Sequence, residues 1–420
     1  MHRIIAAVLA ATPCAAIAQA QETSAMPAGS LLTLEDAIAA AGGSAPAIDA
    51  AEAGIHAAQA GRRTAGLRPN PTIETQVENV AGTGPYRGFD QAETTVGLAL
   101  PIELGGKRSA RIAVADAQSQ RAVLAAAIAQ ADVRFQVTQL FVETVAAKWR
   151  AFNARDQLRI AEESLRVARA RVQAGRASPI EEQRAEVARL NAEAGAERAQ
   201  RLAEANAANL ERRIGRAVGG PIDMTALDAI PPVTYAPVAA PAAAGTLALA
   251  AADADLAYAD AGVRLARSQR LPDITVGPGL RRLEATNDTA AVFSLSIPIP
   301  LFNSGRSAID QATAERSRSE AQHRMTALDV EQAITDARAQ ADNAATAARN
   351  ANGPALAAAH EAARIARIGY REGKFGQLDL LDAERTLAET KLAAIDALAA
   401  YHNARARLER LTAPAPAQGN

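Results

Sequence analysis

The sequence predicts a mainly helical protein with a few β-strands, built by duplication of one structural unit. Its 420 residues are 49% hydrophobic but only 3% aromatic. An alanine-rich composition of this kind favours long helices packed through narrow seams over a thick globular core. Ser109-Ala110 recurs as Ser307-Ala308 and Gly175 recurs as Gly373, so both pairs lie 198 residues apart. A period of this length is typical of a duplicated domain rather than of a short solenoid repeat.

The first twenty residues have the pattern of a secretory signal peptide. An apolar run follows Arg3 and ends at Ala18-Gln19-Ala20, which is typical of a cleavage site. Cys14 is the only cysteine and lies within this segment, so the mature chain would hold no disulfide and no cysteine-based metal site. Lipidation at Cys14 is not expected, because a proline precedes it. No later stretch is apolar over the roughly 18 residues of a transmembrane helix, so we expect an exported protein that does not cross a membrane by helices.

The chain divides into two repeats joined by an irregular segment. We expect a signal peptide at 1–20, the first repeat at 21–217, a Pro- and Ala-rich linker at 218–246, the second repeat at 247–412 and a disordered tail at 413–420. The net charge of −1 gives neither a basic surface for nucleic acid nor an acidic tail.

Each repeat carries the same order of predicted elements: a helix, two strands, a long helix and a further helix. In the first repeat we expect them at 33–63, 72–80, 93–102, 107–174 and 180–215. In the second we expect them at 247–268, 273–282, 291–300, 306–372 and 377–412, with a kink at Asn350–Pro354. The helix over 107–174 would be about 100 Å long, so it must project from any compact domain.

The predicted strands alternate between apolar and small or polar residues. Val96, Leu98 and Leu100 share one face of their strand, whereas Thr95 and Gly97 share the other. Strands of this length suit a tilted crossing of a bilayer, although a small soluble sheet packed on helices explains the alternation equally well.

Four strands cannot close a barrel, and an open sheet edge cannot remain in lipid. A membrane interpretation therefore requires several copies of the chain, and three copies would supply about twelve strands. Glu74, Gln76 and Glu78 would then face water inside the pore.

Several longer motifs resemble one family. They are LRPNPTIETQVENV (67–80), GPYRGFDQAETT (84–95), LPIELGGKRSARIAVADAQ (100–118), VQAGRASPIEEQRAEVARL (172–190), IPIPLFNSGRSA (297–308) and YREGKFGQLDLLDAERTLAET (370–390). Together they resemble the outer membrane factor family, whose best-known member is TolC, and most of all its heavy-metal-efflux, CzcC-like branch. The resemblance spans about 33–412.

The resemblance implies a fold, an assembly and partners. The fold would be mainly α with β: a trimeric TolC-like outer-membrane β-barrel, with four strands per chain, continuous with a long α-helical barrel in the periplasm of a Gram-negative bacterium. The homotrimer would meet a periplasmic adaptor (a membrane fusion protein) and an inner-membrane RND pump, in contact with outer-membrane lipid and without nucleic acid or cofactor. It would export divalent heavy-metal cations such as cobalt, zinc and cadmium.

The strand-to-helix junctions carry prolines, glycines and basic residues, for which we expect distinct roles. Prolines end strands because they cannot donate to the ladder, and glycines let the backbone turn without a Cβ penalty. The basic side chains would meet lipid phosphates at the inner boundary of the membrane, although they suit ordinary solvated helix starts equally well. These residues are Pro101, Gly105, Gly106, Lys107, Arg108, Pro298, Gly305 and Arg306.

The helix breaks match the family's periplasmic tips. Gly175 and Gly373 would let each hairpin reverse, and with Ser178 and Gly376 they would form the tips that contact the adaptor.

Four further residues match family positions that line and constrict the periplasmic aperture: Tyr370, Asp379, Asp382 and Glu181. In a trimer each acidic residue would become a ring of three negative charges, which favours cations. Contacts from Tyr370, Arg367 or Arg371 would hold the ring shut, and Phe375 stands where some relatives carry a gating arginine. The alternative is that Asp379 and Asp382, three residues apart, form a solvated helix face.

The sequence shows no catalytic or metal-binding pattern. The mature histidines are scattered on separate helical stretches, at 56, 323, 360 and 402, and no phosphate-binding loop or catalytic triad pattern stands out. We therefore predict a non-enzyme. Two other functions stay open: an outer-membrane channel for drugs or other organic compounds, and a soluble periplasmic coiled-coil adaptor.

Overall fold

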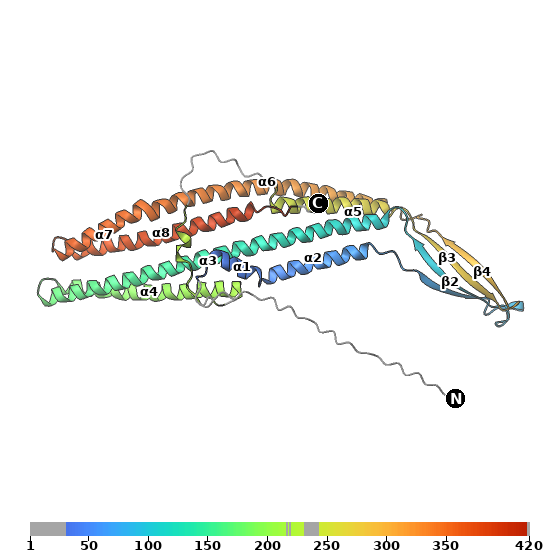
Figure 1. Ribbon diagram of the computed structural model, residues 1–420, viewed down its shortest axis with the longest axis horizontal. Helices are drawn as coiled ribbons and strands as arrows, with labels where there is room; N and C mark the ends of the chain where they lie inside the picture. Colours follow the sequence, from blue (N-terminus) through green and yellow to red (C-terminus); the bar gives the residue numbers. More distant parts are fainter. Residues whose placement is uncertain (1–30, 216, 218–219, 231–242, 418–420) are drawn as a thin grey trace, which may run out of the picture.

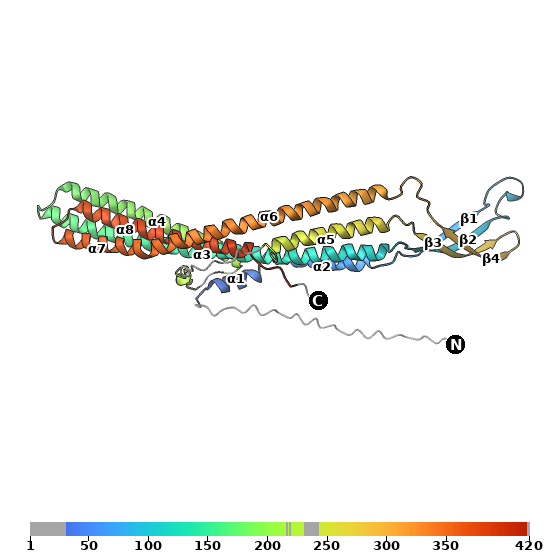
Figure 2. The same ribbon diagram turned by 90° about the horizontal axis from the view of Figure 1, so that it is seen from above.

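The computed structural model describes residues 31–215, 217, 220–230 and 243–417. The expected signal peptide and much of the expected linker lie outside these residues. The described part is a long, narrow molecule with a small sheet at one end and two helical hairpins at the other (Figure 1). Seen from above, the hairpin of α7 and α8 lies beside that of α3 and α4 (Figure 2).

The first repeat contains four helices and two strands: α1 (Leu34–Gly42), α2 (Pro46–Ala65), β1 (Thr72–Glu78), β2 (Glu93–Ile102), α3 (Lys107–Gln173) and α4 (Pro179–Ile214), with a short 3-10 turn at Gly84–Tyr86. The expected single helix over 33–63 is broken, because Gly43 caps α1 and Pro46 begins α2. α3 runs unbroken over 67 residues. None of the described helices is both long and apolar enough to cross a bilayer.

The second repeat follows a 3-10 turn, η2 (Met224–Leu227), and contains α5 (Leu247–Ser268), β3 (Ile274–Leu283), β4 (Asp288–Ser296), α6 (Arg306–Asn350), α7 (Leu356–Arg371) and α8 (Gln377–Leu411). The expected kink appears as a π-helical segment, η3 (Ala351–Ala355), which contains Pro354 and a non-helical Gly353. β4 ends four residues before the predicted end of its strand, at 300, and the segment beyond it contains Pro298 and Pro300, which cannot donate to a ladder.

The tail that the sequence predicts as disordered begins with ordered residues. Pro414 forms a β-bridge with Thr246, and the Ala415 N–H donates to the Gly245 carbonyl oxygen at 2.9 Å. These backbone pairs join the end of the second repeat to its start, within the first residues of the segment for which the sequence predicts disorder.

The strands and the long helices follow the same lateral order. The antiparallel sheet has the order β1-β2-β3-β4. α2 leads into β1 and packs on α3, α3 packs on α5, and α5 packs on α6, which follows β4. Each strand is therefore joined to the helix at the same lateral position, and one edge of the molecule is β1 with α2 while the other is β4 with α6.

The main core lies midway along the molecule, where α1, α4, α8 and η2 meet α3. Phe141, Val145 and Leu210 are buried there, and the Trp149 indole N–H donates to the Met224 carbonyl oxygen at 3.0 Å. Apolar residues at steps of three and four along α3 build this contact.

Candidate functional site

The sheet has one apolar and one polar face. Residues directly paired across the strands share a face, so Ile73, Leu98 and Val96 lie with Leu280. Their side chains are exposed, and Phe293 on β4 is 71% exposed. The large apolar side chains thus point away from the protein's own core, as a surface in contact with lipid requires.

Glu74, Gln76 and Glu78 lie together on the polar face, where sequence analysis missed a basic partner. Arg281 of β3 pairs with Glu93 at 2.7 Å and with Glu78 at 3.1 Å, and its Nε donates to Thr95 Oγ1 at 2.9 Å. The guanidinium therefore ties three strands together. Strand alternation alone would have found it, because consecutive arginines 281 and 282 must point to opposite faces.

The strand-to-helix junctions place glycines where the chain turns. Gly105, Gly106 and Gly305 have φ of +70°, +71° and +72°, the left-handed region that favours glycine. A Cβ on Gly105 would also lie only 2.9 Å from the Ser268 carbonyl oxygen. The two prolines differ: Pro101 lies inside β2, paired with Thr275, whereas Pro298 lies beyond β4.

The basic junction residues divide into two kinds. Lys107 is largely buried, and its Nζ is 2.7 Å from Asp273 Oδ1. Arg108 donates to the Gly66 carbonyl oxygen at 2.6 Å. Within the described part of the chain, Arg306 is exposed and forms no ion pair. Lys107 and Arg108 thus contact their own chain at this junction, and the lipid contact expected from the sequence stays a prediction.

Both hairpin tips turn through the same motif. The Arg176 N–H donates to the Arg171 carbonyl oxygen at 2.8 Å, and the Lys374 N–H donates to Gly369 at 2.8 Å. These six-to-one bonds, with Gly175 at φ +68° and Gly373 at φ +72°, are Schellman motifs that end α3 and α7.

The helices that leave the two tips are capped by different groups. Ser178 Oγ accepts the Ile180 N–H at the start of α4. The Asp379 carboxylate accepts the Gly376 N–H at 2.9 Å at the start of α8. Asp379 therefore stabilises the beginning of α8 as well as adding a charge there.

Tyr370 and Glu181 lie where the two hairpins touch. Tyr370 is 5% exposed, and the Arg171 guanidinium lies 4.8 Å from the centroid of its ring. Burial raises the pKa of Tyr370, against the opposing effect of Arg171. Gln377 Nε2 donates to the Glu181 carbonyl oxygen at 3.1 Å. These contacts join α3 and α4 to α7 and α8 at the tip.

The two aspartates of the predicted aperture are exposed, as is Arg371. Arg367 does not lie free to bind them: it forms a bidentate pair with Glu384, whose side chain is 6% exposed, and one of the two bonds is 2.7 Å long. Phe375 packs on Gly369, where an added Cβ would overlap its ring. A single copy thus keeps Asp379 and Asp382 accessible and holds Arg367 within its own hairpin.

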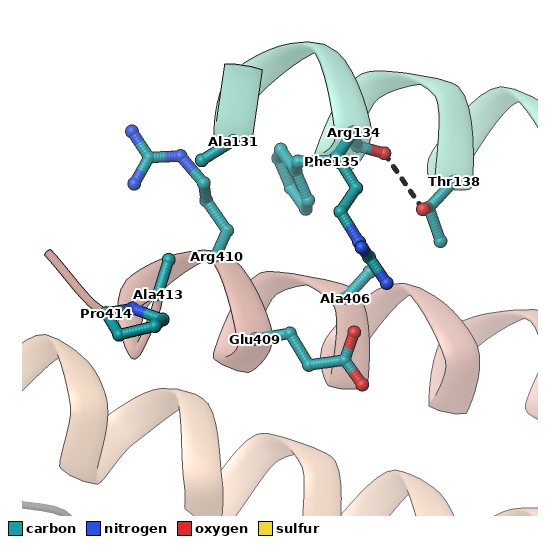
Figure 3. Close-up of a pocket in the computed structure, with 9 residues that line it drawn as sticks. All are labelled: Ala131, Arg134, Phe135, Thr138, Ala406, Glu409, Arg410, Ala413 and Pro414. Carbon is teal, nitrogen blue, oxygen red and sulfur yellow. Dashed lines mark hydrogen bonds between the residues drawn. The ribbon is translucent and has the colours of Figure 1, made fainter. Parts of the chain in front are cut away.

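A separate groove lies between α3 and the end of α8 (Figure 3). Its volume is about 340 Å³, and Arg134, Phe135, Ala406 and Glu409 line it. None of the residues predicted for the aperture contributes to it. Among the described residues, no group of three His, Cys, Asp or Glu side chains could hold a metal ion.

Comparison with known proteins identifies the family. The model of the family described as "Outer membrane efflux protein" matches residues 37–216 and 240–413. The cobalt-zinc-cadmium resistance protein CzcC of Cupriavidus metallidurans is 29% identical over 387 residues, which are 90% of each chain. The nickel and cobalt resistance protein CnrC of the same organism is 31% identical over 277 residues, 66% of each chain.

Solved structures agree on the fold. The outer-membrane channel OprN matches with a TM-score of 0.75 at 20% identity, over 91% of this chain and 90% of that one. The family match excludes the soluble adaptor that the sequence left open. This chain belongs to the outer membrane efflux protein family, in its CzcC-like branch, and is a TolC-like channel protein of the outer membrane and not an enzyme.

Proposed function

We propose that this protein exports divalent heavy-metal cations such as cobalt, zinc or cadmium, as the outer-membrane channel of a tripartite system with a periplasmic adaptor and an inner-membrane RND pump. The observation that carries the proposal is the likeness to a cobalt-zinc-cadmium resistance protein over nine-tenths of both chains. The absence of a strong metal site among the described residues is compatible with transport, because tight binding would slow the passage of an ion.

The channel would be a homotrimer, closed through the two open edges of the chain. Strands β1 and β4 leave their outer hydrogen-bonding groups unpaired, and unpaired edges are not tolerated in lipid. In the helical layer, α2 has no buried residue, while Met325 and Leu328 of α6 are 62% and 67% exposed. These two side chains are three residues apart, so they share one exposed face of α6.

Side-chain pairs between neighbouring helices set the register of α2, α3, α5 and α6 within one copy. Asp116 pairs with Arg62, Asp255 with Arg121, and Asp253 with His323, across α2–α3, α3–α5 and α5–α6 respectively. The same register, continued across the edges, would bring Met325 of one copy level with the small residues around Ala53 of the next. Large side chains on one edge would thus meet small ones on the other, which permits close helix packing.

The aperture would lie at the hairpin tips. Asp379 and Asp382 of three copies would form two rings of negative charge near the threefold axis, which favours cations over anions. The contacts of Tyr370 with Arg171 and of Gln377 with Glu181 would hold the α3–α4 and α7–α8 hairpins together while the aperture is narrow. The turns at Gly175–Ser178 and Gly373–Gly376 would present the surface for the adaptor.

Growth on graded metal concentrations tests the cargo. Deletion of the gene should sensitise the host to zinc, cobalt or cadmium, and the intact gene should restore growth. Copper and organic toxicants serve as the comparison set. Sensitivity confined to the organic compounds would instead favour the drug-efflux channel.

Ion selectivity in single-channel recordings tests the aperture. Asp379→Asn and Asp382→Asn remove the charges while an amide oxygen can still accept the Gly376 N–H, so the helix start should persist. Together they should reduce the preference for cations over anions. Glu389→Gln on the same helix, an exposed residue paired with Arg385, is the matched control. Unchanged selectivity in the double variant would remove these residues from the aperture.

A further inference from the structure

A pocket lies beside the π-helical kink and is distinct from the sheet, the junctions and the tips. Its volume is about 220 Å³, and its walls come from α3, η2, α8 and the segment that begins at η3. Trp149 and Phe152 stand edge to face at one side, with ring centroids 5.8 Å apart. Leu356 and Ala394 contribute to the wall from α7 and α8.

The wall of this pocket includes a buried side-chain oxygen that accepts no hydrogen bond from the described residues. Asn153 is 5% exposed, and its Oδ1 has no hydrogen-bond partner among the described residues. A buried amide oxygen without a donor costs about 1–3 kcal/mol, so such groups are normally paired. Rotation of the amide about its last side-chain bond would offer either its oxygen or its nitrogen to the pocket.

Charges around the pocket are balanced. Lys391 and Asp228 contribute one charge of each sign to the lining, which also includes His360. Lys391 pairs with Asp156, outside the lining, at 3.3 Å. His402, which donates to the neighbouring Leu227 carbonyl oxygen, is outside the lining. The aromatic and aliphatic walls, with the amides of Asn153 and Asn352, one imidazole and one charge of each sign, fit an uncharged molecule better than an ion.

We propose that this pocket binds a small uncharged amphiphile: a single ring or short aliphatic body with one O–H or N–H donor directed at Asn153. Cavities of about 150 Å³ lined by apolar side chains take up benzene, so 220 Å³ accommodates one ring with a short substituent. The bound molecule contacts α3 on one side and the η3–α7 segment on the other, and it therefore braces the kink above the α7–α8 hairpin.

Trp149 makes the proposal directly testable, because it is the only tryptophan in the chain. Benzyl alcohol is titrated into the detergent-solubilised full-length protein while Trp149 emission is recorded. Ethylbenzene, which has a similar shape but no hydroxyl group, is the comparison ligand. We expect a saturable change with both, and tighter binding of benzyl alcohol.

Two variants separate the parts of the site. Asn153→Leu keeps the side-chain volume but removes the acceptor, so benzyl alcohol should bind about threefold to tenfold more weakly while ethylbenzene is unaffected. Ala394→Leu fills the pocket and should abolish both responses. Ala406→Leu makes the same change on α8 at the separate groove of Figure 3 and should leave both titrations as in the unmodified protein.

Several results would overturn the proposal. They are a titration that does not saturate, a response that survives Ala394→Leu, and an equal loss of both ligands in Asn153→Leu. A further contradiction would be a response that appears only after the assembly is dissociated, since a second copy of the chain would then cover the pocket. None of these measurements depends on the identity of the exported ion, so they fail or succeed independently of the proposed transport function.

Discussion

The ion pair between Arg367 and Glu384 allows the strength of the α7–α8 hairpin to be predicted. The Glu384 side chain is 6% exposed, whereas that of Arg367 is 43% exposed. Hydrogen bonds to Glu384 raise the pKa of Arg367, against the opposing effect of burial. Arg367→Gln would leave a buried carboxylate without its cation.

The size of the effect follows from this half-buried geometry. Removing one partner of a fully buried pair costs roughly 3–5 kcal/mol, whereas an exposed pair contributes about 0–1 kcal/mol. Solvent reaches the Arg367 end, so we expect a loss of about 2 kcal/mol. This corresponds to an increase of about 30-fold in the local opening equilibrium of the hairpin. The double variant with Glu384→Gln should lose less, because no unpaired charge remains.

Hydrogen exchange of the α7 and α8 amides measures this opening without requiring two-state unfolding of the whole assembly. Arg364→Gln is the matched control: it lies one turn earlier on α7 and pairs with Glu361, and both side chains are more than half exposed. The control should leave the exchange rates unchanged. The reasoning would be refuted if Arg364→Gln accelerated exchange as much as Arg367→Gln does. It would also be refuted if the double variant with Glu384→Gln exchanged faster than Arg367→Gln alone.

Three further results are expected. Gly105→Ala should lower the melting temperature more than Gly175→Ala: both add left-handed strain of about 1–2 kcal/mol, but only the first brings a Cβ near the Ser268 carbonyl. Equal decreases would contradict the clash. Burial lowers the pKa of His402 below its usual value, so acidification through about pH 6.5 protonates the unfolded chain first and stability falls as the pH decreases. His402→Gln should flatten this dependence, and melting at a series of pH values checks it. Met325→Glu, at a position 62% exposed in one copy, should dissociate the trimer in light scattering, and a persistent trimer would exclude the proposed seam.

The regular elements could be read from periodicity, because their environments repeat. The 3.6-residue pattern along α3 and the alternation in β2 repeat along each element, and both elements agree with prediction within a residue. The ends of helices and strands are harder to predict. Pro46 and Pro298 were visible in the sequence, but how far a helix or strand extends past a proline depends on neighbouring contacts. Pro278 illustrates this, since β3 continues through it next to β4.

The predicted sites depended on contacts that lie far apart in the chain. The glycines at the tips were predictable, because a helix followed by Gly often ends in a left-handed residue. The partners of Lys107 and Arg367 were not, since Asp273 belongs to the other repeat and Glu384 to the returning helix. Side-chain pairing across the repeats has no local sequence pattern.

The shared lateral order of strands and helices ties the width of the membrane part to that of the periplasmic part. Every strand is covalently joined to one helix. Adding or removing a chain from a ring of such chains therefore changes the number of strands and the number of helices equally. A change in copy number would alter both circumferences by the same proportion, and an inserted hairpin without its helices would leave the two cylinders mismatched.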